Sequence, residues 1–270
     1  MPFINVRDLR MYYEIHGTGP RLLSINMTGG DLRRSPNIFD VSIARHFEIL
    51  GYDQRGLGQT SRLDIPCTMA DYADDANGLL EAVGWERCMV MGISFGGMVA
   101  QEFALRYPHR VERLVLACTG SGGAGGVSYP LHELAHLSPE EYVTRVLQLS
   151  DRRRDEAWQA ENPEQYQELF DQTLAGLQVG ADEPGRKMGA RRQLEARTHH
   201  DTHDRLPGLQ VPVYICGGRY DGIALPENLE AMQKQIPGAR MELFEGGHLF
   251  YIQDPRAFDQ IAAFLTEEPG

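Results

Sequence analysis

The sequence predicts an α/β fold in which helices cover a mostly parallel, doubly wound sheet that carries an inserted helical cap. Short apolar runs alternate with helical patterns in the first part of the chain. The alternation stops over residues 127–205, which are charged and helical, and it resumes from residue 206 to the end of the 270-residue chain. Strands that alternate with helices pair in parallel, and helices then cover both faces of the sheet.

The first half supplies the expected core elements in order. The helix expected at about 69–83 has apolar residues with helical spacing, and the helix expected at about 97–107 ends before Pro108. The expected elements are a strand hairpin at 3–6 and 11–15, strands at 21–26 and 47–52, the helix at 69–83, a strand at 88–93, the helix at 97–107 and a strand at 111–118.

The second half begins with a glycine-rich stretch at 119–126 and a long segment without strand patterns. Helices are expected to begin at Ser138-Pro139 and at Asn162-Pro163, because a polar cap residue precedes a proline in each. The remaining expected elements are a strand at 211–216, a helix at 226–235, a strand at 240–244 and a helix at 255–265. We therefore expect a core of residues 1–126 and 206–270, and a helical cap (lid) at 127–205. A cap inserted there would cover the crevice where such sheets bind ligands.

The composition narrows the function. Lys and Arg total 26 against 38 for Asp and Glu, a net charge of −12, so binding to nucleic acid or to an anionic membrane surface is not expected. No apolar run reaches a membrane-spanning length, and the N-terminus has no signal-peptide pattern. The four cysteines are scattered, which favours reduced, mostly buried thiols. We expect a soluble cytoplasmic protein; the sequence does not distinguish a monomer from a homodimer.

The chemistry is indicated by Gly92-Ile93-Ser94-Phe95-Gly96, which matches G-x-S-x-G between an expected strand and an expected helix. A sharp turn there would expose the hydroxyl of Ser94, and the two glycines would leave room for neighbouring backbone. The positive end of the following helix would favour a developing oxyanion.

A serine nucleophile needs a histidine base that an acid orients. In this fold the chain order is serine, acid, histidine. Asp221 follows the strand expected at 211–216, and His248 follows the last expected strand. Residues 117–121 contain no carboxylate, so Asp221 has little competition as the acid. The sequence therefore predicts Ser94, Asp221 and His248 as a catalytic triad.

These residues resemble the α/β-hydrolase superfamily, specifically its capped esterase and lactonase branch, and within it the 3-oxoadipate enol-lactonase-like group. Residues 53–60, Asp-Gln-Arg-Gly-Leu-Gly-Gln-Thr, are similar to a further family motif. The resemblance implies structural roles for Asp53 and Arg55. It also implies an oxyanion hole made by the N–H of Phe95 and that of Met27 or Thr28, although Met27 stands where the family usually has glycine.

The expected reaction is acyl transfer to water from an ester or lactone substrate, without a metal or organic cofactor. Seven cap residues are candidates for an acyl pocket, with simple packing as the alternative: Tyr129, Leu134, Leu137, Trp158, Tyr166, Phe170 and Met188. Arg191 or Arg192 would suit an anionic substrate, but an exposed helix face is the favoured interpretation. Two other functions remain open: a C–C bond hydrolase of diketone-like substrates with the same triad, and a non-enzymatic small-molecule receptor.

Three further motifs favour structural interpretations. His132-Glu133-Leu134-Ala135-His136 matches the zinc pattern H-E-x-x-H, but the flanking prolines allow only a short cap helix of about two turns. Residues 120–125 match G-x-G-x-x-G but no helix follows directly, so a hinge to the cap is expected. Residues 199–204, His-His-Asp-Thr-His-Asp, are expected to form a solvated helix end and not a metal site.

Overall fold

A computed structural model describes residues 2–267 of the chain. Eight strands of the described residues form one sheet in the order β1-β2-β4-β3-β5-β6-β7-β8. The strands β1 (Phe3–Val6) and β2 (Leu9–His16) form an antiparallel hairpin, and β2 pairs antiparallel with β4 (Glu48–Tyr52). All other pairs are parallel; they join β3 (Arg21–Ile25), β5 (Cys88–Ile93), β6 (Val111–Ala117), β7 (Val213–Gly218) and β8 (Arg240–Phe244). The predicted fold class is confirmed.

Helices cover both faces because the central strands are apolar on both sides. The helices α1 (Met69–Ala82), α2 (Phe95–Arg106) and α7 (Pro226–Gln235) pack on one face, against side chains such as Leu23 and Val90. On the other face, α8 (Phe250–Gln253) and α9 (Ala257–Thr266) pack against side chains such as Leu22 and Met91. The predicted helix at 255–265 begins at Ala257, and α8 was not predicted.

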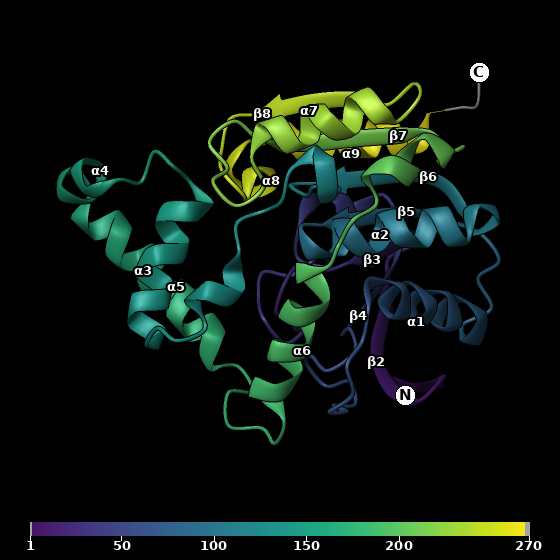
Figure 1. The fold of residues 1–270 in the computed structure, drawn as a ribbon, viewed down its shortest axis with the longest axis horizontal. Helices are drawn as coiled ribbons and strands as arrows, with labels where there is room; N and C mark the ends of the chain where they lie inside the picture. Colours follow the sequence, from purple (N-terminus) through teal and green to yellow (C-terminus); the bar gives the residue numbers. More distant parts are fainter. Residues whose placement is uncertain (1, 268–270) are drawn as a thin grey trace.

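The segment between β6 and β7 contains α3 (Pro139–Ser150), α4 (Glu156–Glu161), α5 (Pro163–Gln178) and α6 (Arg186–Thr198). Figure 1 shows α3, α4 and α5 grouped to one side of the sheet, with α6 leading back to it. Ser138 caps α3 together with Glu141, as predicted. Asn162 precedes Pro163 as predicted, but its side chain does not cap α5 and instead donates to Trp158 O at 2.9 Å. Within residues 2–267, no helix is long and apolar enough to cross a membrane.

Candidate active site

Ser94 occupies the turn between β5 and α2 in a strained backbone conformation. Its φ is 55° and its ψ is −115°, a combination that costs free energy for any residue other than glycine. Two hydrogen bonds hold the turn in place: Ser94 N–H donates to Ala117 O at 2.8 Å, and Thr119 Oγ1 donates to Ser94 O at 2.8 Å. The end of β6 therefore supports the strained serine.

Close backbone contacts explain the two glycines of the motif. A Cβ at Gly96 would lie 2.0 Å from Ile25 O, and a Cβ at Gly92 would lie 2.3 Å from Gly96 O. Both distances are far below van der Waals contact. The prediction that Gly92 and Gly96 make room for neighbouring backbone is confirmed, and the contact with Ile25 brings the end of β3 against the start of α2.

The structure brings Ser94, His248 and Asp221 together in a continuous hydrogen-bonded chain. His248 Nε2 lies 2.9 Å from Ser94 Oγ, and His248 Nδ1 lies 2.7 Å from Asp221 Oδ2. An ionised carboxylate only accepts hydrogen bonds. The tautomer with a proton on Nδ1 therefore donates to Asp221 and leaves Nε2 free to accept from Ser94 Oγ–H.

The acid and the base are both fixed by backbone contacts. Asp221 is fully buried, and its Oδ1 accepts from Ile223 N–H at 2.7 Å and Ala224 N–H at 3.0 Å. His248 N–H donates to Ser150 O at 2.5 Å, so the end of α3 holds the histidine loop. These bonds leave Oδ2 of Asp221 for the imidazole.

A second serine–histidine contact lies behind the glycine-rich stretch. Ser121 Oγ is 3.1 Å from His203 Nδ1, but His203 Nε2 faces Gln235 Nε2 at 3.1 Å and not a carboxylate. Ser121 is completely buried, with Gly125 packed against its hydroxyl. Without an orienting acid and access for a substrate, this pair lacks what a serine nucleophile requires.

The loop after β3 lies beside the serine turn, where the oxyanion hole is predicted. Phe95 begins α2, so its N–H has no intrahelical acceptor. Met27 N–H, however, donates to Asn26 Oδ1 at 2.8 Å, and Gly29 N–H donates to Gln193 Oε1 at 2.8 Å. Within the part of the chain that is described, the buried Thr28 Oγ1 has no partner. Sequence reasoning missed Asn26 and Gln193, since no local pattern marks either residue.

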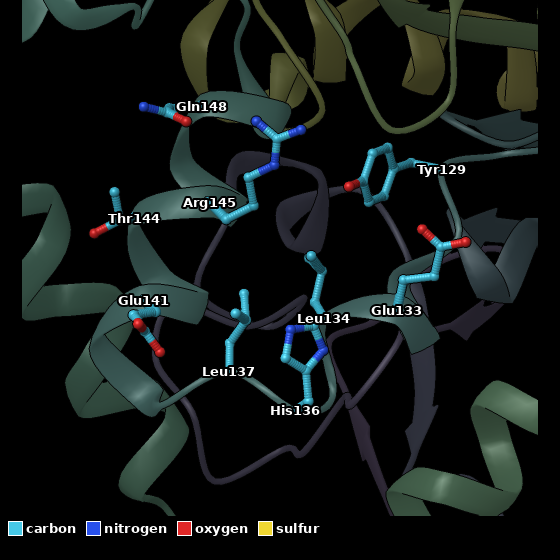
Figure 2. Close-up of a pocket in the computed structure, with 9 residues that line it drawn as sticks. All are labelled: Tyr129, Glu133, Leu134, His136, Leu137, Glu141, Thr144, Arg145 and Gln148. Carbon is cyan, nitrogen blue, oxygen red and sulfur yellow. The ribbon is translucent and has the colours of Figure 1, made fainter.

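Three of the predicted pocket residues line one hollow, which is shown in Figure 2. Tyr129, Leu134 and Leu137 face Arg145 of α3 across an open hollow with a volume of about 570 Å³. Tyr129 N–H also donates to Ile223 O, which ties this wall to the Asp221 loop. Trp158 lies elsewhere: it is on α4, where Arg154 stacks over its ring at 5.9 Å.

Other sequence expectations have mixed outcomes. Arg191 and Arg192 both form ion pairs with Asp64 and Glu195. Arg191 is exposed, as predicted, whereas the side chain of Arg192 is only 19% exposed. The two-turn helix expected around the H-E-x-x-H motif is wrong. Leu131–Leu134 form only a 3-10 turn, because the prolines on either side leave no room for an α-helix.

The histidine-rich segment follows the end of α6, but it is only partly solvated as expected: His199, Asp201 and Asp204 are exposed. His200 and His203 are buried, and His200 Nε2 lies 3.2 Å from Gly120 O. Burial lowers the pKa of His200 to about 4, so it is neutral near pH 7 and its Nε2–H can donate. The glycine-rich stretch itself contains a 3-10 turn, Gly123–Gly125, and no long helix of a dinucleotide site begins directly behind it. Among residues 2–267, no group of three or more His, Cys, Asp or Glu side chains is arranged to hold a metal ion.

Asp53 and Arg55 have the structural roles that the resemblance implied. Asp53 accepts from Leu32 N–H and Gln59 N–H, both at 2.8 Å. Arg55 bridges Asp8 and the buried Asp75. Together they fix the loop after β4.

Comparison with known proteins identifies the family of the chain. The family model described as "alpha/beta hydrolase fold" matches residues 28–255. The protein named "Putative carbamate hydrolase RutD" in Azorhizobium caulinodans is 33% identical, over 97% of this chain and 96% of its own. A poly(3-hydroxyalkanoate) depolymerase of Ectopseudomonas oleovorans is 28% identical over 82% of this chain and 76% of its own.

A solved structure shows the same likeness. The enol-lactonase of Burkholderia xenovorans LB400 superposes with a TM-score of 0.80 and 25% identity, covering 98% of this chain and all of that one. The chain belongs to the α/β-hydrolase family, in the branch that contains esterases and lactonases.

Proposed function

We propose that the chain is a serine hydrolase that cleaves a carboxylic ester or lactone through an acyl-enzyme on Ser94. The hydrogen-bonded chain from Ser94 through His248 to the buried Asp221 carries this proposal. His248 takes the Ser94 proton as Oγ attacks the carbonyl carbon, and Asp221 stabilises the resulting imidazolium. His248 then returns the proton to the leaving oxygen, and water repeats the cycle to release the acid.

The oxyanion would form beside the start of α2. We propose Phe95 N–H as the first donor and Met27 N–H as the second. The Met27 amide is engaged by Asn26 Oδ1, a neutral acceptor. An oxyanion is a stronger acceptor than a side-chain amide, so it would displace Asn26 Oδ1 as the charge develops.

We also propose that residues 127–205 act as the cap over this site. The segment contacts the catalytic loops at both ends: Leu149 O accepts from Gly222 N–H, and Gln193 accepts from Gly29 N–H. The three predicted pocket residues that line the hollow in Figure 2 belong to this segment. The acyl group would then be selected mainly by the cap.

Labelling with a fluorophosphonate probe, followed by mass spectrometry of the peptides, tests the nucleophile without a known substrate. We expect one adduct on Ser94, lost in Ser94→Ala and in His248→Ala. Ser121→Ala is the matched control, because Ser121 also contacts a histidine, and it should label like the wild type. An adduct that persists in Ser94→Ala would refute the proposal.

Substrate choice needs a second assay. Hydrolysis of a p-nitrophenyl ester is expected, with no cleavage of a β-diketone of similar size. Cleavage of the diketone alone would replace the ester proposal with a C–C bond hydrolase that uses the same residues. A folded protein that binds ligands but neither labels nor turns over would be a receptor.

A further inference from the structure

The carboxyl-terminal end of α3 contacts both loops that carry the acid and the base of the candidate triad. On the acid loop, Gly222 N–H donates to Leu149 O at 2.9 Å. On the base loop, His248 N–H donates to Ser150 O at 2.5 Å. The fit is so close that a Cβ at Gly247 would lie 1.8 Å from Ser150 O. The two catalytic loops therefore rest against one short stretch of the segment between β6 and β7.

Gln253 of α8 adds a side-chain connection at the same place. Its Oε1 accepts from Gly247 N–H at 2.7 Å, and its Nε2 donates to Asp151 Oδ2 at 3.1 Å. A backbone N–H only donates and an ionised carboxylate only accepts, so these two partners fix the orientation of the amide. Gln253 therefore joins the residue before His248 to the residue after Ser150.

Asp151 is a buried carboxylate, with 1% of its surface exposed. Arg153 donates to its Oδ1 from Nε at 2.9 Å and to its Oδ2 from Nη2 at 2.7 Å. Burial raises the pKa of the Asp151 carboxyl, but the hydrogen bonds from Arg153 outweigh burial and lower it overall. The carboxylate is therefore ionised at neutral pH and is a strong acceptor for the amide of Gln253.

The loop that leads from β8 to His248 needs such support because it contains two consecutive glycines. Gly246 has a φ of 147°, and glycine backbone has more conformational freedom than any other. Gln253 and Ser150 accept from the two successive N–H groups of Gly247 and His248. These bonds restrain the backbone of the base, and a misplacement of about 1 Å in a catalytic group can lower a rate by roughly a hundredfold.

We propose that Gln253 and Asp151 are positioning residues for His248, and that they hold its backbone where the imidazole reaches Ser94. This inference rests on the proposed function, because His248 is the base of the proposed reaction. Both residues act through the backbone of the histidine loop and not on the reacting atoms. It follows that residues 149–151 stay in place when the rest of the cap admits a substrate.

The kinetics of Gln253→Leu test the positioning role. With p-nitrophenyl acetate, kcat should fall by roughly tenfold to a hundredfold while KM changes by less than about threefold. Gln159→Leu is the matched control: Gln159 of α4 is also half-buried and also bonds to backbone, at Arg154 O, and the variant should keep wild-type kcat. Unchanged kcat in Gln253→Leu, or an equal loss in Gln159→Leu, would overturn the proposal.

Gln253→Glu tests the hydrogen bond to Asp151 through pH. The introduced carboxyl keeps an acceptor for Gly247 N–H, but when ionised it faces the Asp151 carboxylate. Two carboxylates so close to each other raise the pKa of one of them. Once protonated, the new carboxyl can donate to Asp151 as the amide does, so the ratio of variant to wild-type kcat should rise as pH falls from about 8 to about 5. The ratio for Gln253→Leu should stay flat, and a flat ratio for Gln253→Glu would contradict the role of Asp151.

Proton NMR separates this inference from the proposed reaction. The short hydrogen bond between His248 Nδ1 and Asp221 should give a low-field signal without any substrate. We expect the signal to broaden or disappear in Gln253→Leu and to persist in Gln159→Leu; persistence in both would overturn the positioning role. Loss only in Gln253→Leu, in a protein whose wild type neither labels with a fluorophosphonate nor hydrolyses esters, would refute the Ser94 chemistry and keep the positioning role. If Gln253→Leu does not fold, as judged by circular dichroism, Gln253→Glu carries the same comparisons.

Discussion

Replacing Asp221 by asparagine is predicted to inactivate the protein while leaving its fold intact. Oδ1 of Asp221 accepts from two backbone amides, at 2.7 and 3.0 Å. An asparagine there must direct its carbonyl oxygen at those amides, so its NH₂ group faces His248 Nδ1. A donor at that position forces the proton onto Nε2, and Nε2 then cannot accept from Ser94. The wrong tautomer lowers kcat by roughly 10⁴-fold, equivalent to about 5 kcal/mol of activation free energy.

The assay is release of p-nitrophenol from p-nitrophenyl acetate at neutral pH, together with urea unfolding. Both backbone bonds survive in Asp221→Asn, so the free energy of unfolding should fall by no more than about 2 kcal/mol. Asp254→Asn is the control: Asp254 is also buried and accepts from the backbone, at Glu245 N–H, but belongs to no triad. It should keep nearly wild-type activity. Activity of Asp221→Asn within tenfold of the wild type would refute the assigned orientation of His248.

Three further predictions concern stability. Gly96→Ala should lower the free energy of unfolding by roughly 1–3 kcal/mol or more, because its Cβ would clash with backbone. Gly176→Ala, in open space on α5, should instead raise the free energy of unfolding by about 0.5–1 kcal/mol. Equal shifts of the two variants in urea unfolding would contradict both predictions. His200 has a pKa of about 4 in the folded state against 6.5 unfolded, so only the unfolded chain gains the proton as pH falls from 6.5 to 4. Roughly 3 kcal/mol of stability is lost over that window, and His200→Gln should flatten the loss in thermal melts at stepped pH. The buried Asp75 pairs with both Arg55 and Arg7, each at 2.8 Å. Arg55→Met removes the first of these ion pairs and should cost roughly 3–5 kcal/mol; a change under 1 kcal/mol would show that Arg7 alone compensates Asp75.

The core was predictable because its elements are encoded locally. The strands β1, β5 and β8 and the helix α7 have the predicted bounds, and most other core elements differ by one or two residues. Each element is an apolar run or an amphipathic helix bounded by turn residues. The side chains that this local pattern predicts to be buried are therefore the ones that pack in the core. The serine turn was predictable for a related reason. Only glycine fits at Gly92 and Gly96, so the backbone contacts of the turn require the glycines by which the sequence motif is recognised.

The contacts of residues 127–205 with the rest of the chain were not predictable from local pattern. Helix α6 buries a polar face, with Gly189, Gln193 and Arg197 toward the core, so no apolar stripe marks its inner side. Arg191 and Arg192 were the arginines of this helix considered for an anionic substrate, but both are paired with Asp64. Which arginines of this helix are buried depends on contacts with loops more than a hundred residues away.

The loop after β3, which lies beside Ser94, contacts both of these parts of the protein. Asn26 O accepts from Gln54 Nε2 at 2.8 Å, its side chain holds Met27 N–H, and Gln193 of α6 holds Gly29 N–H. Core and cap residues therefore position the same short loop beside Ser94. A substrate group that contacts α6 would act on the helix that also holds Gly29 N–H, two residues from the proposed donor Met27, so substrate recognition and catalysis would be coupled through this helix. This arrangement is compatible with Met27 in place of glycine. The side chains of Asn26 and Gln193 orient the backbone N–H groups of the loop, so a glycine turn is not needed to orient them.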